Sequence, residues 1–568
     1  MEKNMNDEII ITDLYEATRE KERLSEDITG DRWRVLDYET AKYSGKLVCA
    51  SAKCSPRPLS LKLGARGRFH IYLGMMQLRG APTVTSLHLS DTEELSHVSA
   101  ITRYSWTPLE SMVEYFWKTA DLTDKDLIIE KPKDYLEKNS SLAWVKLVPA
   151  DEEPKKLSSI AYHLDSDYFA DDEYSSAKAC TGRIADLSDG GVKLILQEGF
   201  AISPGDKYTA DEALFPRAAK YEWFHKNKSE IESALIDKAH GIGAEIYATY
   251  RLQAGEFCPP NDHSGINILF PDSYKDLNEY RCISRDGRTL GMCSYAYHAV
   301  RARVIENLMS FMERDYDGLA LVFNRGTFVA FEKPICDAVM KQYGVDARRL
   351  PMSDERYRSV ACSFVSEFLR ELREALDAKF TKRKKINAIV FFTPEDSKSF
   401  GFDVETWVNE GLVDSVSQGL MRVFEDLDGC FSDDGLVDLK KYKMALLERP
   451  TVKREFRATP ENLDLIVAGA EKFIRICRGK ADFYATLLWE AQTEEETIAI
   501  YERLNAIGAK NFISWNANHK AKVLSRINAE KFYVAGSREE YNAKKTSYIR
   551  TLSIGGTDIS QFNPNWKG

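Results

Sequence analysis

The chain has few of the features that assign a protein to a class at a glance. None of its apolar runs approaches the roughly 20 residues that span a bilayer. Its ten cysteines are scattered without a CxxC pair, which argues against a zinc ribbon and a disulfide framework. The formal net charge of −10 is spread along the chain, whereas nucleic acid favours a basic face. We therefore expect no membrane partner, no nucleic-acid partner and no cofactor, and the oligomeric state stays open.

The N-terminal segment does not have the pattern of a signal peptide. Its sequence, MEKNMNDEIIITDLYEATREKERLSED, has no apolar core of the kind that a signal peptide carries. Dispersed thiols without a disulfide framework are typical of a reducing compartment. We therefore predict a cytoplasmic location, or secretion if a leader has been removed from the chain.

What the chain does have is length and apolar content. Its 568 residues exceed one compact domain, and 43% hydrophobic residues can supply large cores. From Trp33 to about Lys146, short alternating runs are broken by Gly, Pro and Ser, which is typical of an all-β sandwich. We predict four parts: a charged lead-in at 1–30, a β-sandwich at 31–150, a barrel at 151–525 that starts with a linker at 151–156, and an extension at 526–568 that returns to the sandwich.

The stretch Asp315–Glu332 shows the unit on which the barrel prediction depends. Asp317-Gly318 turns the chain out of a helical segment, and Leu319–Phe323 is an apolar run that suits a strand buried on both faces. The polar pair Asn324-Arg325 ends the run. A strand with polar groups at its C-terminal end, set between two helices, is a βα unit with its site at that end.

Further apolar runs alternate with helical segments in the same way. We therefore predict an α/β fold, a (β/α)8 TIM barrel with an N-terminal all-β sandwich domain. Helix signals support the alternation: Thr459-Pro460 places a cap before a first-turn proline, and apolar residues between Ser353 and Phe380 recur at helical spacing. The predicted strands are Ile160–Asp165, Val192–Leu196, Glu245–Arg251, Leu319–Asn324, Ala388–Phe392, Leu412–Val416, Phe483–Trp489 and Phe512–Asn516.

Alternate residues of a barrel strand face the interior or the outer helices. The helix-facing set should be the apolar one, so the polar set should point inward and, near the C-terminal strand ends, line a pocket. The inward set is expected to contain Tyr247, Arg251, Ala320, Val322, Asn324, Tyr484, Thr486, Glu490, Phe512, Ser514, Asn516 and, just beyond the strand, Asn518, with Ile513 and Trp515 on the helix side.

Glu490 is the strongest candidate for chemistry. It ends the seventh strand beside Trp489, so a carboxylate would lie next to a ring that can stack on a sugar. The structural alternative is an ion pair with Arg251 or Arg325. Those arginines would then either bind an anionic substrate or simply neutralise Glu490 and Asp165.

Other candidates also have a structural alternative. Trp515, like Trp489, is a platform for a sugar ring or a core residue. Tyr295 either reaches the pocket or packs in front of the helix that follows it. Glu332 lies just past the fourth strand, where a surface charge is the simpler interpretation.

Two potential metal ligands lie at the end of the first predicted strand. His163-x-Asp165 at the end of the first strand is similar to the two-ligand motif of barrel metallohydrolases. No second histidine stands there, and the fifth and sixth strands offer none. We therefore expect no metal ion.

Several segments together resemble a bacterial group of glycosyl-hydrolase-like (β/α)8 proteins with an N-terminal β-domain. The matching pieces are RFHIYLGM, SYAYHAVRARVIENLMSFMERDYDGLAL, GFDVETWVNEGLVD and FISWNANH, in that order along most of the chain. The resemblance implies carbohydrate handling. The fourth strand of that group commonly reads DGLELDF-x-R, whereas this chain has Ala320 and Val322 in place of the acids and retains Arg325.

The leading hypothesis is a glycoside hydrolase whose acids come from elsewhere in the barrel. Glu490 would be the nucleophile or base, with Asp165, Glu198 or Glu332 as the acid partner. The alternatives are a carbohydrate-binding barrel that does not hydrolyse its ligand, and a metal-dependent hydrolase. The residues expected to bind the carbohydrate are Arg251, Asn324, Arg325, Trp489, Trp515, Asn516, Asn518, Tyr247 and Tyr295.

Overall fold

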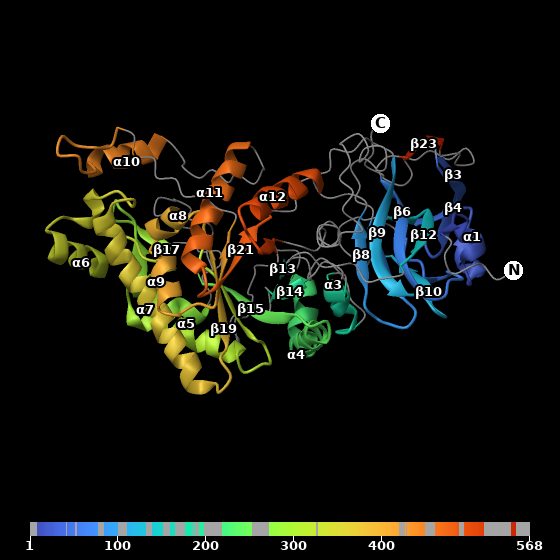
Figure 1. Ribbon diagram of the computed structural model, residues 1–568, viewed down its shortest axis with the longest axis horizontal. Coiled ribbons are helices and arrows are strands. Elements are labelled where there is room, and N and C mark those ends of the chain that lie inside the picture. Colours follow the sequence, from blue (N-terminus) through green and yellow to red (C-terminus); the bar gives the residue numbers. More distant parts are fainter. Residues whose placement is uncertain are drawn as a thin grey trace.

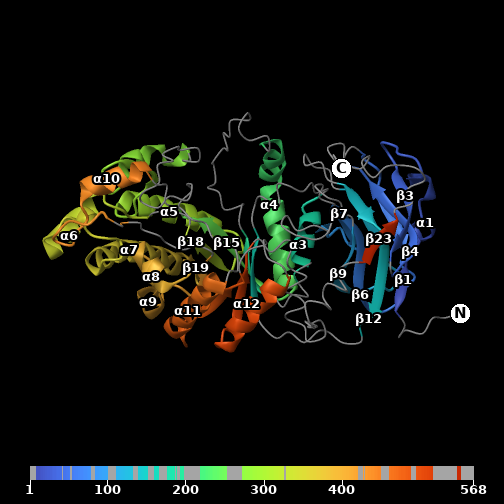
Figure 2. The ribbon, with the colours of Figure 1, turned by 90° about the horizontal axis from the view of Figure 1, so that it is seen from above.

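The computed structural model contains a closed barrel beside two mainly antiparallel sheets of nine and four strands (Figures 1 and 2). In Figure 1 the barrel and its helices lie on the left and the sheets on the right. The predicted linker at 151–156 lies outside the described residues. The structure describes residues 8–40, 42–51, 54–77, 84–99, 111–131, 139–150, 159–164, 176–185, 187, 192–197, 218–252, 272–324, 328–419, 427, 429–448, 460–487, 494–515 and 547–551.

The barrel is built from eight strands, and every neighbouring pair is parallel. Pairing of the first strand with the last closes the ring. The C-terminal ends of all the strands therefore lie at one rim. The predicted fold class, a (β/α)8 barrel preceded by antiparallel strands, is confirmed. The barrel strands are β13 (Ser159–Leu164), β14 (Val192–Gln197), β15 (Glu245–Arg251), β18 (Gly318–Val322), β19 (Lys385–Val390), β20 (Ser415–Gln418), β21 (Asp482–Thr486) and β22 (Asn511–Ser514).

The inward-facing side chains form a buried cluster of their own inside the barrel. The predicted parity of β15, β18 and β21 is confirmed, because their apolar alternate residues pack outside with the helices. The parity predicted for the eighth strand is wrong: Ile513 and Trp515 lie in the inner cluster, while Phe512 packs outside. The indole N–H of Trp515 has a polar partner there, since it donates to Thr486 Oγ1 at 3.2 Å. The inner cluster comprises Ala161, Leu194, Leu196, Tyr247, Ala320, Val322, Ile389, Tyr484, Ile513 and Trp515.

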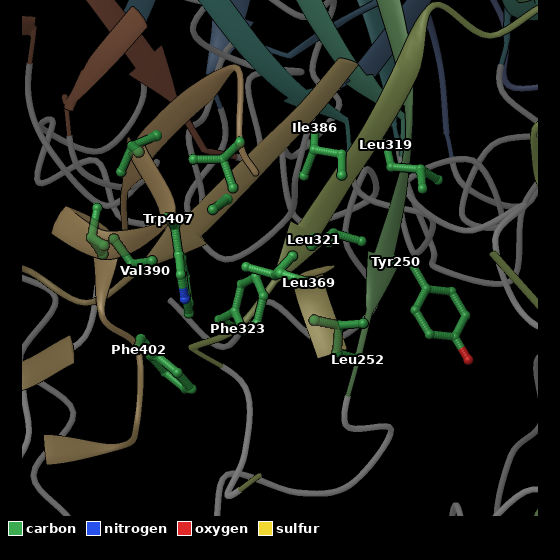
Figure 3. Packing of buried hydrophobic residues seen from close by; sticks show 14 of the residues in the cluster. Tyr250, Leu252, Leu319, Leu321, Phe323, Leu369, Ile386, Val390, Phe402 and Trp407 are labelled. Atoms are coloured by element: carbon green, nitrogen blue, oxygen red, sulfur yellow. The ribbon is translucent and has the colours of Figure 1, made fainter. Parts of the chain in front are cut away.

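The outer face of the barrel packs against helices through large aromatic side chains. Figure 3 shows Phe323, just after β18, beside Trp407 and Phe402. Its ring centroid lies 4.8 Å from that of Trp407 and 5.3 Å from that of Phe402. The indole N–H of Trp407 donates to Ser366 Oγ at 2.9 Å, so burial of this ring leaves no unpaired donor. Each such side chain contributes roughly 1.5–3 kcal/mol through burial.

The helices begin and end where capping chemistry allows. In α7 the Asp354 side chain accepts from Arg356 N–H at the start, and the buried stripe includes Val365 and Leu372 as the helical spacing predicts. Helix α6 ends at Gly344, whose φ of 67° suits a left-handed cap. The helices around the barrel are α3 (Gly182–Ala185), α4 (Ala218–Gly241), α5 (His298–Phe311), α6 (Lys333–Tyr343), α7 (Glu355–Lys379), α8 (Pro394–Ser399), α9 (Val404–Asn409), α10 (Leu439–Glu448), α11 (Pro460–Cys477) and α12 (Glu494–Ala506), with the 3-10 turns η2 (Ala179–Thr181), η4 (Asp272–Tyr280) and η5 (Ala347–Arg349) and the hairpin β16 (Arg281–Ile283) and β17 (Thr289–Cys293).

Two antiparallel sheets make up the N-terminal part, and their buried side chains form one common core. Leu61 and Ile129 from the smaller sheet lie in the same cluster as Ile71 and Val145 from the larger one. The larger sheet also takes in a strand from the far end of the chain, β23 (Ser547–Thr551), which pairs with both β9 and β3. The larger sheet contains β1 (Ile9–Ile11), β2 (Leu24–Ser25), β3 (Trp33–Thr40), β4 (Ser44–Ala50), β6 (Arg68–Gln77), β9 (Ser111–Asp121), β11 (Ser140–Leu142), β12 (Trp144–Pro149) and β23. The smaller sheet contains β5 (Leu59–Lys62), β7 (Val84–Leu89), β8 (Ser96–Ser99) and β10 (Asp126–Glu130), and the short helices α1 (Leu14–Ala17) and η1 (Lys21–Arg23) lie between β1 and β2.

The N-terminal rim of the barrel is fastened by two aspartates that each stand just before a strand. Asp317, before β18, accepts from Ile246 N–H of β15 through its side chain at 3.1 Å and donates its own N–H to Ile246 O at 3.0 Å. Asp414, before β20, repeats the arrangement with Ile386 of β19, at 2.8 and 2.9 Å. This end of a TIM barrel commonly serves stability, and the two aspartates fit that role.

The Asp317 carboxylate predicts a pH-dependent stability. Burial opposes its ionisation, but hydrogen bonds from His240 Nε2 at 2.9 Å and from Ile246 N–H, with the charge of Lys382, hold its pKa below the usual value. A lowered pKa means that the stabilisation is complete above the unfolded pKa of about 3.9 and is lost as the pH falls through the folded value. Asp317→Asn should therefore lower the free energy of unfolding by about 1–2 kcal/mol near pH 5.5, and by progressively less toward pH 2 in acid titrations followed by urea denaturation.

The neighbouring Asp315, which is exposed, supplies the control. Asp315→Asn should change the free energy of unfolding little at either pH. A loss at Asp317→Asn that stays constant from about pH 5.5 to about pH 2 would contradict an electrostatic origin.

Candidate functional site

The structure describes only some of the residues that the sequence predicts for the site. At the C-terminal rim, Arg251 ends β15, Asn324 follows β18, and Trp515 follows β22. Tyr247, Tyr295 and Glu332 are also described. The remaining candidates lie outside the described residues: Asp165, Glu198, Arg325, Trp489, Glu490, Asn516 and Asn518.

Asn324 is held by the backbone of the next barrel strand. Its side chain is buried, and its Nδ2 donates to the carbonyl oxygen of Val390 at 3.3 Å. A side chain on Gly419 would meet both groups, because a Cβ there would lie 2.0 Å from Asn324 Nδ2 and 2.1 Å from Val390 O. Asn324 thus closes the rim between β18, β19 and the residue after β20. This contact favours a positioning role for its amide.

Glu332 is buried rather than exposed to a rim. Its side chain is 1% exposed and accepts hydrogen bonds from Ser294 Oγ and from Ala330 N–H, the latter at 3.0 Å to Oε2. Burial raises the pKa of this carboxyl, and the hydrogen bonds only partly oppose that effect. The group joins the loop before α5 to the loop before α6. This burial and these partners fit a structural role for Glu332 better than the role of a catalytic acid.

The two candidate tyrosines make internal contacts. Tyr295 is buried, donates its hydroxyl to Leu252 O at 2.9 Å, and packs its ring against Phe328 and Phe368 at centroid distances of 4.7 and 4.9 Å. Tyr247 donates to Glu245 Oε2 at 2.9 Å, at the opposite end of the strand from the C-terminal rim. Burial, followed by the charge of Glu245, raises the pKa of Tyr247. Both phenols have the environment of structural residues.

Trp515 and Arg251 end their strands at the C-terminal rim. The Trp515 ring belongs to the inner cluster and its indole N–H is bonded to Thr486, so the core alternative describes it better than a sugar platform. Arg251 is partly exposed and lies opposite Val322 in the strand ladder. Among the described candidates, Arg251 is the one that carries a charged side chain at the end of a barrel strand.

Polar residues of β19 and β20 were not among the site residues predicted from the sequence. Asn387 lies inside the barrel, where its Nδ2 donates to Ser415 Oγ at 2.8 Å and Ser417 Oγ at 3.0 Å. Gln418 donates to Phe392 O at 2.8 Å and Ile466 O at 3.0 Å, and its Oε1 accepts from Thr486 N–H at 3.2 Å. It thus joins β20, β21 and α11 at the rim. The available signal was weak: Ser415 and Ser417 stand on either side of a single apolar residue, Val416.

Other kinds of site are not formed within the described ranges. No group of three or more His, Cys, Asp and Glu side chains there is arranged to hold a metal ion, although the side chains of His163 and Asp165 are not among those described. The described cysteines are free thiols, mostly buried, and burial raises the pKa of Cys293 to about 12. No helix in the described chain combines the length and apolarity needed to cross a bilayer.

Comparisons with known proteins give similarity in structure alone. No family model matches the chain, and no curated protein sequence matches it. Among solved structures, the chain is similar to the glycoside hydrolase domain of PelA from Pseudomonas aeruginosa, with 12% identity and a TM-score of 0.30 over 64% of this chain and 96% of that one.

Two further solved structures show the same level of similarity. They are a chitinase-like agglutinin from Robinia pseudoacacia, at 10% identity and a TM-score of 0.33 over 64% of this chain and 98% of that one, and the catalytic domain of a β-amylase from Paenibacillus polymyxa, at 9% identity and 0.35 over 65% and 95%. The barrel of the present chain follows from its own strand pairing, and similarity at this level does not select an activity.

Proposed function

We propose that the barrel is a glycoside hydrolase that acts on an oligo- or polysaccharide through carboxylates at its C-terminal rim. The observation that carries this proposal is the common direction of the strands. Leu164, the last residue of β13, lies opposite Gln197, the last residue of β14. The chain therefore leaves two neighbouring strands at this rim immediately before Asp165 and Glu198. It leaves β21 at the same rim shortly before Glu490.

The chemistry needs two carboxyl groups in different protonation states. In this proposal Glu490 is ionised and acts as nucleophile or general base, while Asp165 or Glu198 is protonated and donates to the leaving oxygen. A separation of about 5–5.5 Å would give retention, and about 6.5–9.5 Å would give inversion. Trp489 supplies a stacking face for the sugar ring, and Arg251 and Arg325 supply hydrogen bonds.

A second candidate function is favoured by the interior of β18. Ala320 and Val322 face inward and are buried in the inner cluster. Glu332, beyond the same strand, is buried and hydrogen-bonded. The described part of this βα unit thus offers no exposed carboxylate at the rim. A barrel that binds carbohydrate without cleaving it is the function that fits this observation.

One screen separates these functions. Purified protein is tested for binding on a glycan array and for cleavage of a panel of oligosaccharides, each with and without EDTA. Binding with EDTA-resistant cleavage is the result expected for the hydrolase. Binding without cleavage would favour the second candidate, cleavage abolished by EDTA would favour a metal-dependent hydrolase, and neither binding nor cleavage would reject carbohydrate as the ligand.

A further inference from the structure

Ala320 of β18 lies between two polar side chains inside the barrel. Thr249 of β15 and Asn387 of β19 are its direct partners in the strand ladder. Partners in adjacent strands share a face of the sheet, and Ala320 faces the interior, so the hydroxyl of Thr249 and the amide of Asn387 are both carried on the inner face. Thr249 is 1% exposed and Asn387 is 0% exposed.

Part of this polar set has its hydrogen bonds satisfied and part has not. Both hydrogens of the Asn387 amide are used, toward Ser415 Oγ and Ser417 Oγ. Within the described chain, Asn387 Oδ1 and Thr249 Oγ1 have no hydrogen-bond partner, and both atoms are shielded from solvent. Buried polar atoms in folded proteins nearly always have a partner, either a protein group or an ordered water. Two such atoms on either side of an alanine therefore require an explanation.

We propose that the barrel interior binds at least one ordered water molecule beside Ala320, hydrogen-bonded to Thr249 Oγ1 and Asn387 Oδ1. The amide oxygen accepts a hydrogen bond from the water, and the threonine hydroxyl either donates to it or accepts from it. Ala320 contributes only a methyl group between the two, which leaves more room than any other apolar residue except glycine would. Thr249, Asn387, Ser415 and Ser417 carry no charge, so the chemistry suits a neutral, small ligand such as water.

The substitution Thr249→Val tests the proposal through the sign of its effect. Valine keeps the branched shape and the strand propensity of threonine, and replaces the hydroxyl with a methyl group. If Thr249 binds a water, the variant loses a hydrogen bond and the unfolding equilibrium constant should rise roughly two- to tenfold. If the hydroxyl is buried without a partner, removing it relieves a cost, and the constant should stay unchanged or fall. The second result would overturn the proposal.

Thr486→Val is the matched control. Its hydroxyl accepts from the Trp515 indole inside the same barrel, so the substitution should raise the unfolding constant whether or not water is bound near Ala320. Crystals of the wild-type protein and of Thr249→Val complete the test. In the wild type we expect water density about 2.6–3.2 Å from both Thr249 Oγ1 and Asn387 Oδ1, and in the variant no water contact to position 249. A wild-type interior without such density would contradict the proposal even if Thr249→Val were destabilised.

Discussion

Replacing Glu490 with glutamine is expected to lower the rate of glycan cleavage by about 10²–10⁴-fold while leaving carbohydrate binding nearly intact. A carboxylate that attacks the anomeric carbon or activates a water must be ionised and basic, and the amide is neither. The amide keeps the size of the side chain and one hydrogen-bond acceptor, so Trp489 and the two rim arginines, Arg251 and Arg325, should still hold a sugar. The measurement is kcat on a cleaved oligosaccharide together with the Kd for the same compound.

The same substitution also tests the structural alternative for Glu490. If Glu490 is the counter-ion of Arg251 or Arg325, the amide removes that carboxylate from the arginine, and the melting temperature should fall clearly. Lost turnover with an unchanged melt supports catalysis. Retained turnover with a lowered melt would show that Glu490 is structural and that the site assignment is wrong.

Glu395 provides a matched control for that experiment. It stands in the first turn of α8, just beyond the C-terminal end of β19, and its carboxylate lies 2.7 Å from Lys472 Nζ. The carboxylate is 53% exposed, so the ion pair contributes at most about 1 kcal/mol. Glu395→Gln should leave both cleavage and melting temperature close to those of the wild type. A comparable loss of activity in this variant would show that the assay responds to any charge change at the rim.

Asp414→Ala should produce the largest loss of stability, about 3–5 kcal/mol. The Asp414 carboxylate accepts from Arg373 Nη2 at 3.0 Å, from Arg383 Nε at 2.8 Å and from Ile386 N–H at 2.8 Å. The side chain of Arg373 is only 7% exposed. Removing the Asp414 side chain therefore deprives a buried guanidinium of its closest carboxylate. It also removes the side-chain hydrogen bond to Ile386 N–H, while the backbone bond from Asp414 N–H to Ile386 O remains. Urea denaturation measures the loss as a shift of the midpoint at constant slope.

Asp377 makes a control on the same arginine. Its carboxylate lies 3.4 Å from Arg373 Nη1, but it is 47% exposed, compared with 20% for Asp414. Solvent screens that pair, so Asp377→Ala should cost about 0–1 kcal/mol. Equal losses of unfolding free energy in Asp377→Ala and Asp414→Ala would contradict the proposal that Asp414 is the main partner of Arg373. An Asp414→Ala variant whose stability is within about 1 kcal/mol of the wild type would contradict it as well.

The barrel was predictable because its strands are short apolar runs that alternate with helical sequence. Leu319–Phe323 is an example, since β18 is buried throughout and its apolar alternate residues pack against the helices, as predicted. The boundaries of the sixth strand were less accurate. Leu412 and Val413 are apolar and buried, but they precede the strand, and β20 starts at Ser415. The hydroxyls of Ser415 and Ser417, which accept from the Asn387 amide N–H groups inside the barrel, give this strand a weak apolar pattern in the sequence.

The candidate site was harder to predict because its side chains depend on contacts between distant segments. The parity of β22 was misjudged because Thr486 of the neighbouring strand provides the partner that lets Trp515 turn inward. Glu332 is buried because Ser294 and Ala330 converge on its carboxylate. No local sequence pattern predicts either the Trp515–Thr486 contact or the burial of Glu332. Sequence parity predicts Asn324 on the inner face, but the bond from its amide to Val390 O depends on the neighbouring strand.

A crystal structure of Glu490→Gln with a bound oligosaccharide tests the central claim most directly, through the separation of the side chains at the sugar. We predict that position 490 and either Asp165 or Glu198 flank one glycosidic bond, with their carboxyl or amide carbons about 5–5.5 Å apart or about 6.5–9.5 Å apart. A sugar bound at the rim with no pair of these side chains within about 10 Å of each other, or with position 490 directed at the outer helices, would contradict the assignment of glycoside hydrolysis to these residues.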